Sequence, residues 1–296
     1  MMHADEVGID AAMVRRLLAD QHLQWSDLPI SMVRSTGTVN AIYRLGDDLC
    51  VRLPRMLCWA KDLHTEYEWL PQLALHLSLR VPEPVAKGRP GSGYPFSWAV
   101  YRWIGGQPYA DDLIDDERQA ATDLAHFIIE LRRIAPVAGA PHGGRQPLRD
   151  LDTDTGVAID SARDVIDSVA ATAAWDVALR APAWDGPPVW IHTDLLRPNL
   201  LVHGGRLRAV IDFGGVGVGD PAADVIAAWS VFGPTGREAF RDVLDVDDNI
   251  WNRARGFALH QAAMIIPYYR QSNPRFVELA KRTVEQVLVD CNTGMR

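Results

Sequence analysis

The chain has 296 residues, of which 48% are hydrophobic, enough to bury one large core or the cores of two lobes. Its formal net charge of −8, from 38 acidic residues against 30 lysines and arginines, argues against nucleic-acid binding as its main role. Three cysteines without a CxxC pair indicate reduced thiols in a cytoplasmic protein, and no apolar run or leader pattern predicts a membrane span or a secretory signal.

The first third of the chain predicts a small antiparallel sheet. Residues 9–22 carry apolar side chains at helical spacing, which predicts an amphipathic helix. Residues 30–54 contain three short β-rich runs separated at STGT and at GDD, which is typical of an antiparallel meander. A helix is expected over 61–77, disturbed by Pro71, and a buried strand is expected in SWAVYRWI after a Pro- and Gly-rich stretch.

From Gly106 onward the composition becomes helical. A long amphipathic helix is expected over 115–134, followed by a loop-rich stretch and then by helices in most of the remainder. This order indicates an α+β fold with two lobes and a cleft between them. The predicted N-terminal lobe spans residues 1–104, the predicted helical C-terminal lobe spans 105–296, and YRWIGGQ is the linker.

A charged loop between two apolar runs carries the most specific pattern. In WIHTDLLRPNLLV, residues 190–202, His192 precedes Asp194, and four residues separate Asp194 from Asn199. Thirteen positions after Asn199, Asp212 begins the tripeptide DFG. The order H-x-D-x-x-x-x-N and then D-F-G is that of the catalytic and metal-binding loops of kinases. The strands NLLV and RAVID, joined at HGGR, are expected to form a hairpin that brings Asn199 and Asp212 together.

Phosphoryl transfer explains why these residue types are present. Asp194 would accept or orient the proton of the acceptor hydroxyl, while Asn199 and Asp212 would hold Mg²⁺ ions that neutralise the phosphates. Magnesium prefers oxygen ligands and few protein contacts. A metal-dependent hydrolase with His192 and Asp194 as ligands is the competing chemistry, but further His and Asp clusters at ligand spacing are lacking.

Taken together, HTDLLRPNLLV and AVIDFGGVGVGDPAADV resemble the aminoglycoside phosphotransferase family, the antibiotic-kinase relatives of protein kinases. The resemblance covers residues 30 to 290, with one departure, because Thr193 stands where the family usually has glycine. It implies a protein-kinase-like fold, ATP or GTP as the donor, Mg²⁺ as the cofactor, and a hydroxyl on a small molecule as the acceptor.

The segment after DFG argues separately against a protein substrate. Only five residues separate DFG from Asp220, and no APE motif follows, so the chain lacks a peptide-docking activation segment. Asp220 is expected to brace the catalytic loop, as the resemblance suggests, whereas Asp224 is expected to serve as a helix N-cap or first-turn carboxylate. The residues expected to support the catalytic loop are His192, Arg197 and Asp220.

The N-terminal lobe offers candidates for nucleotide binding. In STGTVN, small residues between two β-rich runs would let backbone N–H groups approach phosphates; a plain hairpin turn is the alternative. The candidates in this loop are Ser35, Gly37, Thr38 and Asn40. In the linker, the candidates for backbone contacts to the base are Arg102, Trp103 and Ile104.

The third strand should carry a cation for the α- and β-phosphates, and it offers Arg52 where protein kinases have lysine. Arginine stays charged and can bind phosphate through two donors, so the function is retained on this interpretation. The alternative is a solvent-exposed arginine on an edge strand. Its partner carboxylate is expected on the following helix, where Glu66 is favoured over Glu68.

The acceptor is the least determined part. Candidate lining lies in residues 111–117 and 260–270, with Trp229 and Tyr268 as candidate contacts. The acidic segment 111–117 would suit a polyamine-like antibiotic, although acidic residues at a helix start commonly serve the helix dipole. The family resemblance implies an aminoglycoside or another antibiotic as the acceptor, with choline, homoserine or a sugar as alternatives. A nucleotide-binding pseudokinase stays open as a second class because Arg52 replaces lysine.

Overall fold

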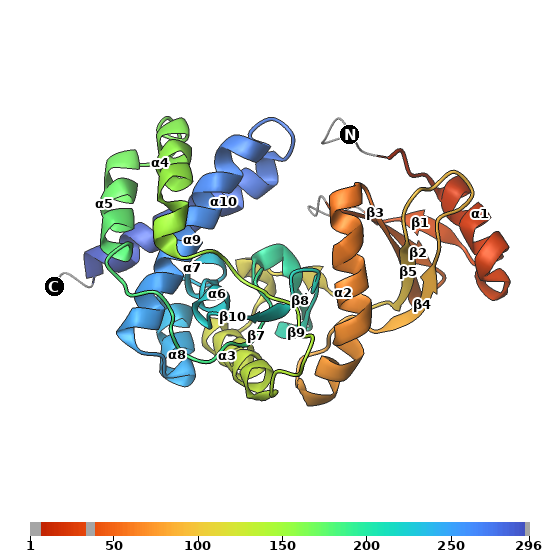
Figure 1. Ribbon diagram of the computed structural model, residues 1–296, viewed down its shortest axis with the longest axis horizontal. Helices are drawn as coiled ribbons and strands as arrows, with labels where there is room; N and C mark the ends of the chain where they lie inside the picture. The colour runs from red at the N-terminus through yellow and green to blue at the C-terminus, as the bar shows by residue number, and fades with distance from the viewer. Residues whose placement is uncertain (1–6, 34–38, 294–296) are drawn as a thin grey trace.

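The computed structural model describes residues 7–33 and 39–293, which form a sheet lobe up to Arg102 and a larger helical lobe from Gln107 onward (Figure 1). Five strands of the sheet lobe are antiparallel, in the order β1-β2-β3-β5-β4. They are β1 (Ile30–Met32), β2 (Asn40–Leu45), β3 (Leu49–Pro54), β4 (Pro84–Gly88) and β5 (Trp98–Arg102). The predicted meander is confirmed. β4 was not predicted, because prolines obscure its pattern; Pro84 is tolerated there as the first residue of an edge strand.

Helices cover both faces of this sheet, which leaves β3 buried along its whole length. α1 (Ala11–Gln21) packs its apolar stripe against one face. α2 (Leu57–Leu73) covers the other face and lies between the sheet and the helical lobe (Figure 1). Because side chains alternate along a strand, Val51 and Leu53 face α1, whereas Arg52 faces α2 and the cleft.

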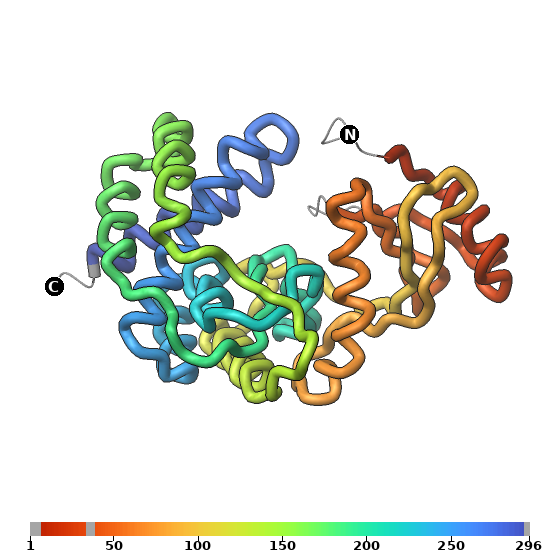
Figure 2. Tube along the Cα trace, in the orientation of Figure 1, coloured from red at the N-terminus to blue at the C-terminus, as the bar shows by residue number. Residues whose placement is uncertain are grey.

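The helical lobe contains most of the remaining chain, and its core is formed where these helices pack together. Its helices are α3 (Glu117–Arg133), α4 (Asp152–Ser161), α5 (Ser168–Ala178), α6 (Ala222–Val225), α7 (Ala227–Ser230), α8 (Pro234–Leu244), α9 (Asp248–Tyr269) and α10 (Pro274–Thr293). In Figure 2, α4 and α5 lie beside α9 and α10 at one end of the lobe. The helix expected over 115–134 is confirmed as α3. α4 lies in the segment expected to be loop-rich, because its Asp residues and Gly156 weaken the helical pattern.

Short strands at the junction of the lobes hold the charged loop. They are β6 (Gln107–Pro108), β7 (Val189–Ile191), β8 (Leu200–His203), β9 (Arg206–Val210) and β10 (Gly217–Gly219). β8 and β9 form the predicted hairpin, with β6 along the free edge of β8, and β7 pairs with β10. Single turns of 3₁₀ helix complete the elements, at Leu23–Trp25, Ala74–His76, Asp111–Leu113, Leu148–Leu151 and Arg197–Asn199.

The predicted α+β architecture, with an antiparallel sheet followed by a helical lobe, is confirmed. Within residues 7–33 and 39–293, no helix combines the length and the apolar character needed to cross a membrane.

Candidate active site

The two candidate metal ligands meet at one end of the β8–β9 hairpin. Asn199 immediately precedes β8, and Asp212 follows β9 after one residue. The N–H of Ile211 donates to the carbonyl of Asn199 at 2.9 Å, which extends the ladder beyond the pairing of Leu200 with Val210. Asp212 has φ +68°, so the chain turns out of the strand direction at this residue. The hairpin thus brings together two oxygen-bearing side chains that are distant in the sequence.

Asp194 is held by two side-chain amides. Asn199 Nδ2 donates to Asp194 Oδ2 at 2.8 Å and to the Asp194 carbonyl at 2.9 Å. Gln261 Nε2, on α9, donates to Asp194 Oδ1 at 2.7 Å. Burial and the neighbouring Asp212 raise the pKa of Asp194, against the hydrogen bond from Gln261. The amide nitrogen of Asn199 faces Asp194, so its amide oxygen is left to bind a cation.

His192 connects the loop to the strand that leads to Asp212. Its Nδ1 accepts from the N–H of Asp194 at 3.2 Å, so Nε2 carries the proton and donates to the carbonyl of Ile211 at 3.1 Å. The ring is fully buried and packs edge-on against Phe213, with 4.5 Å between centroids. These contacts fit the supporting role expected of His192.

The carboxylate that braces the loop is Asp224, and the expectation for Asp220 was wrong. Asp224 is fully buried and accepts from the N–H of His192 at 2.9 Å and from that of Thr193 at 2.8 Å. Asp220 instead accepts from Ala222 N–H and forms an ion pair with Arg253 at 2.8 Å. Asp224 lies in the first turn of α6 as expected and also takes the role assigned to Asp220, because only the tertiary packing decides which carboxylate reaches the residues after β7.

Thr193 adopts a backbone conformation that favours glycine. Its φ is +79°, which is unusual for a β-branched residue and explains why a glycine would suit this position. The conformation is held by Asp224, by Arg145 Nη1 donating to the Thr193 carbonyl at 3.2 Å, and by Thr193 Oγ1 donating to the Gly215 carbonyl at 3.3 Å. The last contact ties the catalytic loop to the segment after DFG.

Arg197 anchors the other side of the loop within the helical lobe. Its guanidinium donates to the Val231 carbonyl at 2.7 and 2.9 Å and pairs with Asp111 through two donors at 2.5 and 3.0 Å. The side chain is buried and has all of these acceptors on protein, so it supports the loop and is directed away from the cleft.

The predicted cation of β3 is buried and paired with Glu66, the favoured partner. Arg52 Nη1 lies 2.7 and 2.6 Å from the two carboxylate oxygens of Glu66, and Nη2 lies 3.3 Å from Asp212 Oδ1. Tyr101 adds its ring 5.2 Å from the guanidinium. Glu68 is exposed and pairs with His64 instead. The solvent-exposed alternative for Arg52 is therefore wrong, and the guanidinium links the sheet lobe to Asp212.

The remaining nucleotide-binding candidates lie just before β2 or at its start, and in the linker between the lobes. Ser35, Gly37 and Thr38 lie outside the described residues, while Asn40 begins β2 opposite Pro54. In the linker, the N–H groups of Arg102 and Trp103 donate to the carbonyls of Glu83 and Asp48, and Ile104 packs against β8 and β9. The first two linker N–H groups are thus engaged within the protein.

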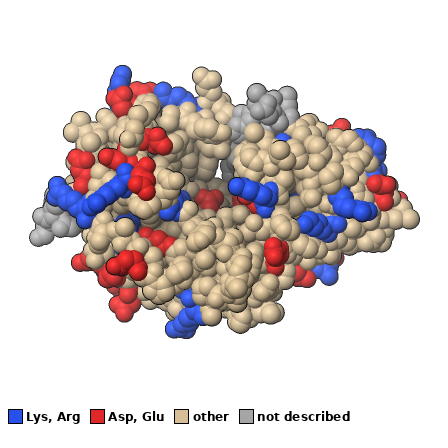
Figure 3. Space-filling model, in the orientation of Figure 1, with Lys and Arg blue, Asp and Glu red and all other residues tan. Residues whose placement is uncertain are grey.

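A cavity of about 910 Å³ opens beside Asp194, between α4, α9 and the start of α2. Gln261 and Tyr268, from the segment 260–270 named as candidate lining, contribute to it. Arg145 also lines it, and the sequence analysis missed this residue because no local motif marks it. Figure 3 shows a hollow between the lobes, with mainly uncharged atoms on its left wall and charged atoms at its floor and right rim. Trp229, in contrast, is fully buried against Trp251 and does not line the cavity, so its assignment as an acceptor contact was wrong.

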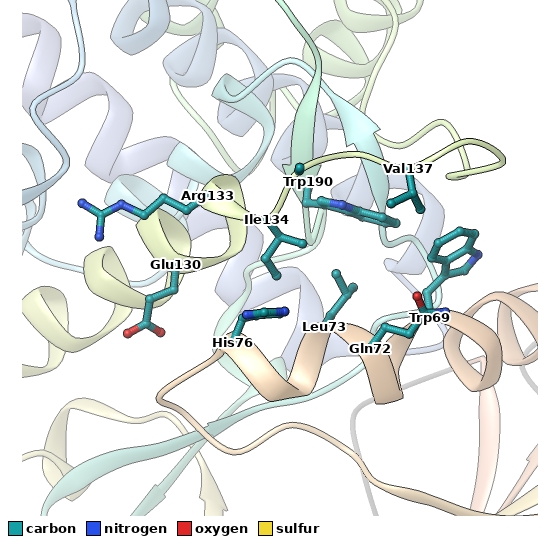
Figure 4. Close-up of a pocket in the computed structure, with 10 residues that line it drawn as sticks. Trp69, Gln72, Leu73, His76, Glu130, Arg133, Ile134, Val137 and Trp190 are labelled. Atoms are coloured by element: carbon teal, nitrogen blue, oxygen red, sulfur yellow. The ribbon is translucent and has the colours of Figure 1, made fainter.

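A second cavity, of about 580 Å³, lies outside this cleft, between the C-terminal ends of α2 and α3. In Figure 4, Trp190 lies above Leu73 with Trp69 to one side, while Glu130 and Arg133 lie toward one end. None of the predicted site residues lines it. The chemistry expected from the sequence therefore belongs to the cleft between the lobes.

Three features in the cleft between the lobes define a kinase-like site. They are an acid held by two side-chain amides, an adjoining amide with a second acid, and a buried cation–carboxylate pair. The profile of the phosphotransferase enzyme family matches residues 33–257. The chain belongs to this family, which confirms the resemblance found in the sequence.

Solved structures with the same fold superpose on nearly the whole chain. The GDP and kanamycin complex of APH(2")-IIia superposes with a TM-score of 0.75 at 20% identity, covering 94% of this chain and 98% of that one. The apoenzyme of macrolide 2'-phosphotransferase MphH from Brachybacterium faecium superposes with a TM-score of 0.61 at 19% identity, covering 92% and 97%. At such identities the likeness concerns the fold, which is protein-kinase-like as predicted.

One curated relative is an uncharacterized protein, YcbJ, from Bacillus subtilis (strain 168). It is 28% identical over 171 residues, which are 55% of this chain and 53% of that protein. The matched segment thus spans about half the length of the relative.

Proposed function

We propose that this protein transfers the γ-phosphate of ATP or GTP to a hydroxyl group of a small molecule of the antibiotic class. The observation that carries the proposal is the arrangement around Asp212, which lies within 3.3 Å of the buried Arg52–Glu66 pair and at the same hairpin end as Asn199. A cation for the phosphates and oxygen ligands for a metal thereby converge next to Asp194.

In the proposed reaction, the acceptor oxygen bonds to the γ-phosphorus while the bond from that phosphorus to the β–γ bridging oxygen breaks. Asp194 accepts or orients the hydroxyl proton, and its two hydrogen-bonded amides fix the direction of the carboxylate. Arg52 binds phosphate oxygens, and Glu66 holds its guanidinium in place. The nucleoside diphosphate leaves with the electrons of the broken bond.

Asn199 and Asp212 would hold Mg²⁺. The donor set fits this ion, because an amide oxygen and a partly exposed carboxylate provide hard oxygen ligands and leave room for phosphates and water. When bound, the metal neutralises negative charge on the phosphates. The chain's own contribution is to position these oxygens through the β8–β9 hairpin.

The relatives support a nucleotide donor and an antibiotic acceptor. Structures of similar proteins are described as complexes with GDP, ADP or ATP, and with kanamycin, gentamicin or streptomycin. The intact set of Asp194, Asn199 and Asp212 favours a catalyst over a pseudokinase. We further infer a cytoplasmic protein, where nucleoside triphosphates are available, and a nucleotide lobe that ends at residue 104.

A two-stage experiment tests the proposal. Melting temperatures with ATP, GTP and their Mg²⁺ complexes identify the donor, and phosphate transfer from that donor is then followed over a panel of antibiotics. Asp212→Ala should lose the Mg²⁺-dependent part of nucleotide binding. If this variant keeps full Mg²⁺-stimulated turnover, the metal assignment is wrong.

A further inference from the structure

Three carboxylates of the acidic segment 111–117, which suggested a polycationic acceptor, form contacts within the helical lobe. Asp111 pairs with the buried Arg197, and Asp116 caps α3 by accepting from the N–H of Gln119 at 3.2 Å. Glu117 accepts from the N–H groups of Gly233 and Gly236 at 2.7 and 3.0 Å. These carboxylates therefore stabilise the helical lobe, and they do not line the cavity beside Asp194.

The cavity beside Asp194 is instead mainly apolar and aromatic. Its walls include Trp59 from α2, Val157 from α4, and Met264 and Tyr268 from α9. Among the carboxylates of the described residues, Asp154 is the one that lines it. His260 also faces this side, and burial lowers its pKa to about 4, so it adds no positive charge near neutral pH. Such walls suit an amphiphilic body better than a strongly hydrated polycation.

Arg145 is the cation of this cavity. Its Nη1 donates to the carbonyl of Thr193, next to Asp194, yet no carboxylate pairs with it within 4.0 Å in the described part of the chain. Burial lowers the pKa of this guanidinium, with Asp194 and Asp224 opposing the effect from a distance. Because buried charges are normally paired, a half-buried guanidinium that lines a cavity is suited to an anionic partner.

We propose that the acceptor is an amphiphilic hydroxyl compound that places an anionic group, such as a carboxylate, against Arg145, and that polycations are disfavoured. The inference rests on the proposed phosphotransfer for the role of Asp194, but the charge preference belongs to the cavity itself. The γ-phosphate of the nucleotide is a second source of the same anionic chemistry. It would approach from the Arg52 side of Asp194, whereas Arg145 comes from the side of α4 and α9.

A matched pair of probes tests this preference by calorimetry. 4-Nitrophenyl β-D-glucuronide and 4-nitrophenyl β-D-glucoside share an aromatic body and three ring hydroxyls, and they differ at C6, which is a carboxylate in the first and a hydroxymethyl group in the second. Kanamycin serves as the polycation. We expect the glucuronide to bind the wild type about fivefold or more tightly than the glucoside, and kanamycin to bind most weakly. Arg145→Gln should abolish the difference, Arg145→Lys should retain part of it, and Asp154→Asn should not reduce it.

The other outcomes are decisive in the opposite direction. The inference is overturned if kanamycin binds most tightly, if none of the three probes binds, or if the glucuronide preference survives in Arg145→Gln. It is also overturned if Arg145→Gln lowers affinity for nucleoside triphosphate relative to diphosphate, which would assign Arg145 to the γ-phosphate. In each of these cases the proposed phosphotransfer still stands if the wild type hydrolyses nucleotide in the presence of Mg²⁺ and the Asp212→Ala variant does not.

Discussion

Arg52 and Glu66 form a buried ion pair between β3 and α2, with Arg52 Nη1 at 2.7 and 2.6 Å from the carboxylate oxygens. The same guanidinium reaches Asp212 Oδ1 at 3.3 Å. Because Arg52 belongs to the sheet lobe and Asp212 to the helical lobe, this one side chain connects the candidate phosphate cation with the candidate metal ligand across the cleft.

Replacing Arg52 should weaken nucleotide binding and stability together. Arg52→Ala leaves Glu66 buried without its partner, and we expect a loss of about 3 kcal/mol in the free energy of unfolding. Arg44→Ala, on the neighbouring β2, is the control, since Arg44 packs over the Trp103 ring and contacts the turn at Gly46. Calorimetry with ATP or GTP should show a much larger loss for Arg52→Ala; equal losses would assign Arg52 to structure alone.

The brace on the catalytic loop gives a second prediction. Asp224→Asn leaves one acceptor oxygen for the two N–H donors of His192 and Thr193, and its new amide N–H₂ faces the second donor. We therefore expect the free energy of unfolding to fall by about 2 kcal/mol. Turnover should fall as His192 and Asp194 lose their positions. The exposed Asp185→Asn, with the same charge change, should alter neither quantity. Unchanged turnover in Asp224→Asn would show that the loop does not depend on this carboxylate.

Thr193 allows backbone strain to be separated from hydrogen bonding. Thr193→Gly relieves a left-handed conformation that costs about 1 kcal/mol, but it removes the contact to Gly215, so stability should change by less than about 1 kcal/mol. Thr193→Val keeps the strain and loses the hydrogen bond, and it should be the less stable of the two. Urea unfolding compares them, and the reverse order would contradict this interpretation.

His260 makes stability depend on pH. Burial and Arg145 lower its pKa to about 4, while its Nδ1 lies 2.8 Å from Thr155 Oγ1. The unfolded state binds the proton more readily, so this contribution to stability is complete above about pH 6.5 and is lost as pH falls toward 4. The loss of stability between pH 7.5 and 5 should therefore be smaller in His260→Gln, by about 1 kcal/mol. An identical loss in both proteins would mean that His260 titrates normally.

The sequence predicted those features that short stretches of chain determine. The spacing of Asp194, Asn199 and Asp212 implies a loop and a hairpin, whereas the shift in register between Leu201 and Val202 was not predicted. Arg52 was assigned from its place on the third strand, and Glu66 from its spacing to Leu70 and Leu73, which resembles that of the family. These arguments need no knowledge of distant packing.

The features that were missed depend on contacts between distant segments. Gln261 reaches Asp194 from α9, and Asp224 rather than Asp220 faces β7 because of how α6 packs. Trp229 is a core residue although its segment was expected to approach the acceptor. Neither composition nor periodicity distinguishes a polar side chain that supports a distant loop from one that caps its own helix.

The most direct test of the account is a comparison of Asp194→Asn with the wild type. Asparagine keeps the shape of the side chain but cannot accept the hydroxyl proton, so turnover should fall about 10²–10⁴-fold. The nucleotide dissociation constant should change little, since Asn199, Asp212 and Arg52 remain. The melting temperature should also change little, because the Gln261 amide can rotate and offer its oxygen to the new N–H₂ group, which the backbone donors to Asp224 cannot do. Near-normal turnover with a suitable acceptor would contradict the role of Asp194, and a collapsed melting temperature would show that this residue serves the fold instead.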